Sequence, residues 1–232
     1  MTLQPSLFKG HKGPRIQPAV AVRRLAAADA ILGALMASVG RYTVTGEDLL
    51  HPVASLARAI TGQQLSGPVA RVIYARLQTL LGRVTPDRLL AADPEALRGV
   101  GLSYAKVAAL RDLAQKARDG VVPTAAKLHQ LSDDEIVERL TAVKGIGRWT
   151  VEMLLLFHLG RPDVLPVDDL GIRKGFQLTY GERDLPKPKV LSAFGERWRP
   201  YRSVASWYLW RSLDLQKATN NAPSGAKAAK GA

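Results

Sequence analysis

The sequence predicts an all-α fold. Apolar residues recur every three or four positions along most of the 232-residue chain, which is the period of helices with one buried face. The helical segments open at Ser, Thr or Asp residues and several close at Gly, as helix caps favour. No stretch alternates apolar and polar residues over the length of a strand, so we expect few or no strands.

The boundaries of the helices come from their capping residues. Ser66 is a candidate N-cap, and Ser132 with Glu135 has the spacing of a capping box. Two short turns open at Thr85-Pro86 and Asp93-Pro94, because Pro suits the first helical position. The expected helices span residues 19–40, 48–64, 66–82, 103–120, 132–143, 148–159, 169–180 and 199–215.

The charge of the chain indicates a polyanionic partner. The net charge is +13, and residues 1–17 and 216–232 each carry three basic residues and no acid. The remaining body therefore keeps 13 − 6 = +7, which favours nucleic acid over the alternative of a merely soluble basic protein. We expect residues 1–16 to be an irregular segment and 216–232 to be a disordered basic tail.

Several kinds of site and location are excluded or disfavoured. The chain has no Cys, so it forms no disulfide and holds no iron–sulfur cluster through cysteines. Its four His residues show no metal-ligand spacing, and we expect His51 and His158 to be structural. There is no secretory signal core and no apolar run of membrane-spanning length. We expect a soluble protein of the cytoplasm or nucleus that is not secreted.

The stretch TAVKGIGRWTVEML, residues 141–154, places a Gly-Ile-Gly turn between two predicted helices. Glycines allow a tight turn and the close approach of another backbone, and the N–H groups that open the second helix suit a phosphate. Ile146 can anchor the turn in the core. The alternative is a helical hairpin with a glycine-rich stop, and the flanking Lys144 and Arg148 favour the phosphate-binding interpretation.

With its loop HLGRPDVLPVDDLGIRKG at 158–175, the chain resembles the helix-hairpin-helix (HhH-GPD) DNA glycosylase superfamily. The match is most similar to the 3-methyladenine DNA glycosylase II (AlkA) type, through GIGRWT and LPVDDLGIRKG, with ARAITGQQLS and RWRPYRSVASWYLW near its two ends. The resemblance implies a two-lobed helical fold with the active-site cleft between the lobes. One lobe would be residues 46–158, and the other would join 17–45 to 159–215.

The resemblance assigns the essential carboxylate to Asp169, with Asp168 as second choice. Taken alone, two adjacent Asp residues at a helix start read as a cap and a first-turn acid. In the family the essential Asp precedes the pattern x-x-[Ile/Val]-[Arg/Lys], which aligns it with Asp169, leaving Asp168 as a neighbour or helix cap. The carboxylate would stabilise the positive charge that develops on the sugar as an N-glycosidic bond breaks.

The base pocket implied by the resemblance includes Trp149, Trp210, Met153 and Asp168. Aromatic faces attract an electron-deficient alkylated base, although either Trp could instead be ordinary core, as we expect for Trp198 and Trp207. Superfamily members that also cut the backbone have a Lys where this chain has Trp149, so the resemblance implies a glycosylase without lyase activity.

The resemblance also implies the DNA contacts. Gln64 or Leu65, if not buried core, would fill the gap left by the flipped base. The amides of Gly145, Gly147 and Thr150, with Lys144 or Arg148, would bind phosphate. A monovalent cation, Na⁺ or K⁺, could be held by the carbonyls of Thr141, Val143 and Gly145.

The sequence thus indicates a monofunctional glycosylase that excises alkylated bases from damaged double-stranded DNA in base excision repair. We expect it to act as a monomer, away from membranes and with no required cofactor. Two alternatives remain open: a non-catalytic helix-hairpin-helix DNA-binding protein, and a glycosylase for other damaged bases.

Overall fold

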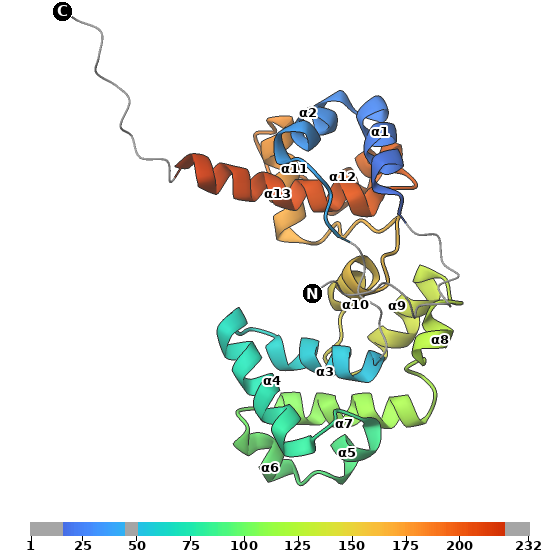
Figure 1. The fold of residues 1–232 in the computed structure, drawn as a ribbon, viewed down its shortest axis with the longest axis vertical. Coiled ribbons are helices and arrows are strands. Elements are labelled where there is room, and N and C mark those ends of the chain that lie inside the picture. Colours follow the sequence, from blue (N-terminus) through green and yellow to red (C-terminus); the bar gives the residue numbers. More distant parts are fainter. Residues whose placement is uncertain (1–15, 45–50, 221–232) are drawn as a thin grey trace, which may run out of the picture. The chain divides into compact units, whose positions relative to one another are not determined.

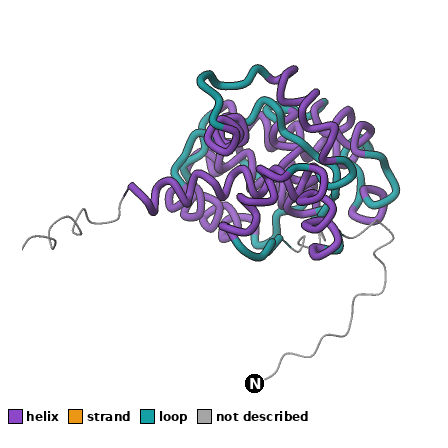
Figure 2. The backbone as a smooth tube through the Cα atoms, turned by 90° about the horizontal axis from the view of Figure 1, so that it is seen from above, coloured by secondary structure: helices purple, strands orange, loops and turns teal. Residues whose placement is uncertain are grey.

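The computed structural model describes residues 16–44 and 51–220. In this part of the chain helices are joined by loops and there is no strand, so the predicted all-α fold is confirmed (Figure 2). The expectation for residues 1–16 falls, except for Ile16, outside the described residues, as does that for 221–232. No helix in the described ranges combines the length and apolar character needed to cross a bilayer.

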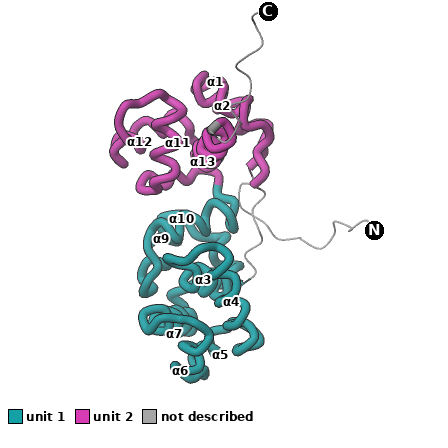
Figure 3. The backbone as a smooth tube through the Cα atoms, turned by 90° about the vertical axis from the view of Figure 1, so that its left-hand side faces the viewer, with its two compact units in different colours: residues 1–14, 45–161 teal, residues 15–44, 162–232 magenta. Residues whose placement is uncertain are grey.

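The chain divides into two compact units (Figure 3). Unit 1 is residues 1–14 and 45–161, and unit 2 is residues 15–44 and 162–232. Unit 2 is therefore built from two segments far apart in the sequence, and the chain enters unit 1 between them.

Unit 1 contains the capped helices that the sequence indicated. Thr85, Asp93 and Ser103 each accept a hydrogen bond from a backbone N–H three residues on, and Ser132 and Glu135 form the complete capping box. Ser66 stands at an N-cap position but makes no capping hydrogen bond. The helices are α3 (Pro52–Gly62), α4 (Gly67–Leu81), α5 (Pro86–Ala91), α6 (Pro94–Gly99), α7 (Tyr104–Arg118), α8 (Ala125–Leu128), α9 (Asp133–Thr141), α10 (Arg148–Met153) and the π-helix η1 (Leu154–His158).

Helix α7 is the central element of unit 1. It packs against α3 and α5, and Figure 1 shows α3 running beside it. Leu110 and Leu113 of α7 are fully buried, as are Leu56 and Ile60 of α3. These side chains form the apolar core that fixes α3 and α7 together.

Unit 2 consists of helices from both ends of the described chain. They are α1 (Pro18–Ala28), α2 (Ala30–Val39), α11 (Leu170–Tyr180), α12 (Pro188–Gly195), the 3₁₀ helix η2 (Glu196–Trp198) and α13 (Arg202–Asn220). Helices α11 and α13 pack closely, because Gly175 lies against the carbonyl of Leu209 and leaves no room for a side chain.

Two sequence expectations in unit 2 are corrected. The single helix expected over 19–40 is broken at Asp29, which has an extended backbone and caps α2 by accepting from the Leu32 N–H. The tail expected to be disordered from residue 216 is helical as far as Asn220. Gln, Lys and Ala favour the helical state, and Thr219 donates to the carbonyl of Leu215, so nothing stops α13 at 215.

The break at Asp29 also places a buried carboxylate in unit 2. Its side chain accepts from the Tyr180 hydroxyl at 2.6 Å and from Trp198 Nε1 at 2.9 Å. Burial by itself would raise the pKa of Asp29, but the hydrogen bonds from Leu32, Tyr180 and Trp198, with the charge of Arg197, lower it below its usual value. Asp29 thus connects α2 to α11 and η2.

Candidate active site and nucleic-acid interface

The hairpin between α9 and α10 has the geometry that its glycines indicated. Gly145 has a φ of +80°, a conformation that side chains disfavour. Ile146 is only 4% exposed and its N–H donates to the carbonyl of Val143, so this side chain anchors the turn in the core of unit 1. Ile146 therefore holds the turn against unit 1, while Gly145 and Gly147 are exposed.

The polar groups of the hairpin are arranged around these glycines. Among the described residues, none accepts a hydrogen bond from the N–H of Gly145 or Gly147. The Thr150 N–H donates to the carbonyl of Gly147 at 3.0 Å. Lys144 and Arg148 are exposed on either side, and Arg148 is held by the buried carboxylate of Glu152 at 3.0 Å. Two amides and two cations therefore share one exposed turn.

Two of the three carbonyl groups considered for a cation accept hydrogen bonds. The carbonyl of Val143 accepts from the Ile146 N–H, and that of Gly145 accepts from Gln63 Nε2 at 2.7 Å. A carbonyl oxygen has two lone pairs, so each retains one acceptor direction. The set of Thr141, Val143 and Gly145 is compatible with a monovalent cation on this ground and stays a prediction.

Unit 1 has a cavity of about 610 Å³ beside the hairpin. Trp149 and Met153 line it, and Trp149 is 50% exposed, so it is not a core residue. The cavity is also lined by residues for which the sequence predicted no role in a site, among them Ser55, Phe157 and His158. Phe157 follows Trp149 and Met153 at four-residue steps, and this helical spacing could have identified it. His158, expected to be structural, forms part of the wall.

A short turn after α3 forms another side of this cavity. Gln64 and Leu65 line it and both are exposed, so neither is buried core. Gln64 has a φ of +59°, and among the described residues it is the only non-glycine with a positive φ. Backbone strain of this kind persists where surrounding contacts enforce it, and it concentrates at functional sites.

In unit 2, Asp169 is the N-cap of α11. Its Oδ1 accepts from the Ile172 N–H at 2.8 Å and from Trp210 Nε1 at 2.9 Å. Asp168 precedes it and is exposed, so the suggestion that Asp168 caps the helix is wrong. Helix α11 and the indole of α13 together fix one carboxylate oxygen of Asp169.

Gly171 makes this arrangement possible. A Cβ at this position would lie 2.9 Å from Trp210 Cδ1 and Nε1 and 3.0 Å from Asp169 Oδ1. These distances are shorter than carbon contacts allow, so any side chain here would displace the indole or the carboxylate. The Asp-Leu-Gly sequence is therefore part of the site as well as a helix start.

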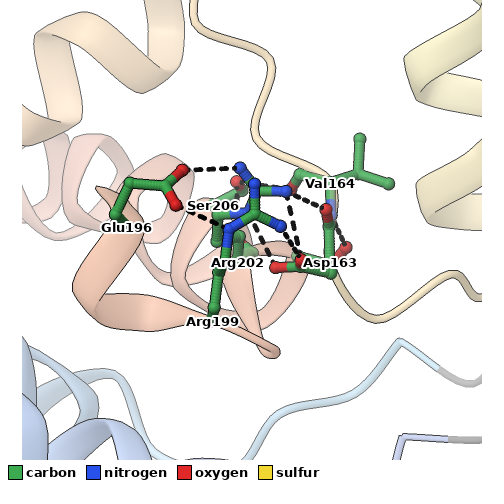
Figure 4. A network of polar contacts seen from close by, with 7 residues as sticks. Asp163, Val164, Glu196, Arg199, Arg202 and Ser206 are labelled. Atoms are coloured by element: carbon green, nitrogen blue, oxygen red, sulfur yellow. Dashed lines mark hydrogen bonds and ion pairs between the residues drawn. The ribbon is translucent and has the colours of Figure 1, made fainter. Parts of the chain in front are cut away.

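A charged network fixes the loop that leads to Asp169 (Figure 4). Arg202 of α13 binds the carboxylate of Asp163 at 2.7 Å and its carbonyl at 2.9 Å, and Arg199 also pairs with Asp163. The Val164 N–H donates to Ser203 Oγ. The charge-assisted hydrogen bonds of Arg199 and Arg202 to Asp163, together with this neutral bond, restrict the loop before it enters α11.

Trp198 and Trp207, expected to be packing residues, are buried. Trp198 also donates to Asp29, and Trp207 packs edge-on against Tyr42 and Tyr208.

Comparisons with known proteins give a consistent result. The HhH-GPD superfamily of base excision DNA repair proteins matches residues 57–200. DNA-3-methyladenine glycosylase 1 of Schizosaccharomyces pombe is 38% identical over 172 residues, covering 73% of this chain and 75% of that protein. DNA-3-methyladenine glycosylase 2 of Escherichia coli is 32% identical over 164 residues, covering 66% of this chain and 55% of that protein.

The chain is also similar to solved structures of 3-methyladenine DNA glycosylases. A 3-methyladenine DNA glycosylase of S. pombe in complex with abasic DNA has a TM-score of 0.72 and 36% identity, covering 83% of this chain and 95% of that one. A DNA-3-methyladenine glycosidase of Bacillus halodurans has a TM-score of 0.78 and 34% identity, covering 85% of this chain and 91% of that one.

Proposed function

Because the chain belongs to the HhH-GPD superfamily of base excision DNA repair proteins, we propose that it is a DNA glycosylase that excises alkylated bases. The observation that carries the proposal is the carboxylate of Asp169, held at Oδ1 by the Ile172 N–H and Trp210 Nε1. The named relatives, which are 3-methyladenine glycosylases, support the same substrate class.

The reaction is hydrolysis of an N-glycosidic bond. As the base leaves, positive charge develops on the deoxyribose, and a fixed negative charge stabilises that transition state or orients the attacking water. The two hydrogen bonds to Asp169 keep its carboxylate in one orientation, which avoids reorganisation during the reaction. We assign this role to Asp169.

Recognition of the base rests on aromatic rings. An alkylated base is often cationic, so it gains about 0.5–2 kcal/mol for each ring face that it contacts. We assign this role to Trp149 of unit 1 and to Trp210 of unit 2, with Met153 in the wall of the unit 1 cavity. A cationic base is already a good leaving group, so the reaction needs no strong acid to protonate it.

Binding of the DNA backbone is assigned to the hairpin. The N–H groups of Gly145 and Gly147, with the charges of Lys144 and Arg148, are suited to phosphate and read no base sequence. Gln64 or Leu65, in the exposed turn after α3, would occupy the space vacated by the everted nucleotide.

We further propose that the product is an abasic site in an intact strand. Lyase members of the superfamily form a Schiff base through a Lys, and this chain has Trp149 at that position. An indole cannot act as the nucleophile. The strand should therefore break only after alkali treatment of the product.

The test is release of free base from methylated duplex DNA, measured by mass spectrometry, with strand breakage followed before and after alkali. Asp169→Asn should lower the rate of release at least about a hundredfold, since it removes the charge and keeps a side-chain oxygen for both hydrogen bonds. DNA affinity should be unchanged or tighter, because one negative charge near phosphates is lost. Asp184→Asn, an exposed acid in the same unit, is the charge control.

If Asp169→Asn released base at the wild-type rate, the assignment would be contradicted. The variant Asp168→Asn would then show whether the neighbouring carboxylate acts instead. A wild-type protein that binds methylated DNA and releases no base would favour the non-catalytic alternative. Release confined to oxidised or deaminated bases would favour another glycosylase specificity. A strand broken before alkali would contradict the absence of lyase activity.

A further inference from the structure

The first turn of α7 binds the turn after α3. Lys106 Nζ donates to the carbonyls of Thr61 and Gln63, each at 2.8 Å. These carbonyls are at the C-terminal end of α3, where a positive charge is favourable. Burial lowers the pKa of Lys106, so this ammonium is partly withdrawn from water to make the contacts.

The same helix binds the hairpin six residues later. Asp112 Oδ2 accepts from the Lys144 N–H at 2.7 Å, and Lys116 Nζ holds the same carboxylate at 2.8 Å. Between these two contacts, Ala109 faces Gly145, where an added Cβ would lie 3.4 Å from the Ala109 Cβ. One face of α7 therefore meets both the turn after α3 and the hairpin.

A third contact joins these two features directly. Gln63 Nε2 donates to the carbonyl of Gly145 at 2.7 Å, across 82 positions in the sequence. The carbonyl of Gln63 thus accepts a hydrogen bond from Lys106, while its side chain donates one to the hairpin. Gln64, with its positive φ, follows immediately, so the strained residue is next to one that is anchored on both sides.

We propose that α7 acts as a spacer that fixes the turn 63–65 relative to the hairpin 143–147, with Lys106 and Asp112 as positioning residues for base eversion. This inference rests on the proposed function. A duplex with one everted nucleotide presents a gap in the base stack at a set distance from the phosphates. Lys106 and Asp112 are separated by about 9 Å along a stiff helix, so each turn is attached to its own point on α7 while Gln63 links the two turns directly.

Helix α7 is also held by apolar side chains. Leu110 and Leu113 are fully buried and fix the helix in the core of unit 1. Lys106 contacts the turn after α3 and Asp112 contacts the hairpin, so both residues orient these turns against a helix that is already packed. Their removal should therefore affect base eversion more than stability.

The test compares two duplex substrates under single-turnover conditions. In one the methylated base is paired, and in the other it lies opposite an abasic position, where eversion costs less. Lys106→Met should lower release from the paired substrate about tenfold and from the unpaired substrate less than threefold. Lys106→Arg should restore release, because a guanidinium can donate to both carbonyls. Lys127→Met removes an equal charge from an exposed position of unit 1 and should change neither rate.

Asp112→Ala tests the second contact of α7, the one with the hairpin. It should also lower release from the paired substrate more than release from the unpaired substrate. Hydrogen–deuterium exchange provides a readout that does not need activity: amides of 63–66 should exchange faster in Lys106→Met, while those of the α7 core should not. Equal loss on both substrates, or unchanged exchange at 63–66, would overturn the spacer proposal. A wild-type protein that releases no base would contradict the proposed function, and the exchange data would still decide the spacer.

Discussion

Asp29 shows how one residue can set both a helix boundary and a tertiary contact. It ends α1, caps α2 and accepts hydrogen bonds from Tyr180 and Trp198. Removing the carboxylate would take the acceptor away from the fully buried Trp198 indole and from the half-buried Tyr180 hydroxyl, and a buried donor without an acceptor is costly.

Asp29→Ala should lower the free energy of unfolding by about 2–4 kcal/mol at pH 7, because α2 loses its cap and the Trp198 and Tyr180 donors lose this acceptor. The lowered pKa fixes the sign of the pH dependence. The charged carboxylate contributes stability above its unfolded pKa of about 3.9, and this is lost as the pH falls through the lower folded value. Urea denaturation from pH 7 to pH 3 measures the difference, with the exposed Asp184→Ala as control. A difference that grows toward low pH would contradict this account.

At the scale of elements, the pairing of α11 with α13 determines the site in unit 2. Helix α11 contributes Asp169 at its N-cap and α13 contributes Trp210, and two glycines of α11 allow the helices to approach. Gly175 meets the backbone of Leu209, and Gly171 meets the Trp210 ring. The glycines are thus needed for space, although helices ordinarily disfavour them.

Gly171→Ala should reduce single-turnover base release at least about tenfold, because the new methyl group must displace the Trp210 indole or the Asp169 carboxylate. The thermal midpoint should change little, because Ala has a higher helix propensity than Gly and this offsets part of the cost of the steric clash. Gly99→Ala in α6 is the control, as its Cβ would meet no atom within 4 Å. Unaltered release by Gly171→Ala would show that the close approach is not required.

At the scale of the whole molecule, the net charge of +13 governs long-range attraction to DNA. Much of this charge is spread over both units, while the hairpin concentrates Lys144 and Arg148 beside the exposed Gly145 and Gly147. Binding to undamaged duplex should therefore weaken steeply with salt, as counterions are released from phosphates.

Lys144→Ala should reduce the slope of log affinity against log salt by about one, since one phosphate contact is lost. Lys189→Ala, which removes an exposed charge from α12, should leave the slope within error of wild type. Fluorescence anisotropy with undamaged duplex at several salt concentrations provides the measurement. Equal slopes for Lys144→Ala and wild type would remove Lys144 from the phosphate contact.

The family, the all-α fold and most helix boundaries could be predicted because they depend on local patterns. Ser132 and Glu135 signal their capping box within four residues, and the Gly-Ile-Gly turn signals the hairpin within three. The break at Asp29 was missed because the Ala- and Leu-rich segment around it favours a continuous helix, and buried partners from distant elements outweigh that preference. The C-terminal end of α13 was predicted at residue 215 because the residues after it have no apolar pattern, although their helix propensity favours continuation to Asn220.

The sequence by itself determined the helical elements, the glycine turn, the basic charge and the family to which the chain belongs. Only the tertiary structure decided that Trp210 holds Asp169, that Phe157 and His158 line the cavity, and that α7 binds two turns 82 positions apart. The physical reason is the distance along the sequence over which each interaction acts. Caps, turns and helical periodicity act between near neighbours in the chain, whereas these contacts form only after packing brings distant backbone and side-chain groups within hydrogen-bonding distance.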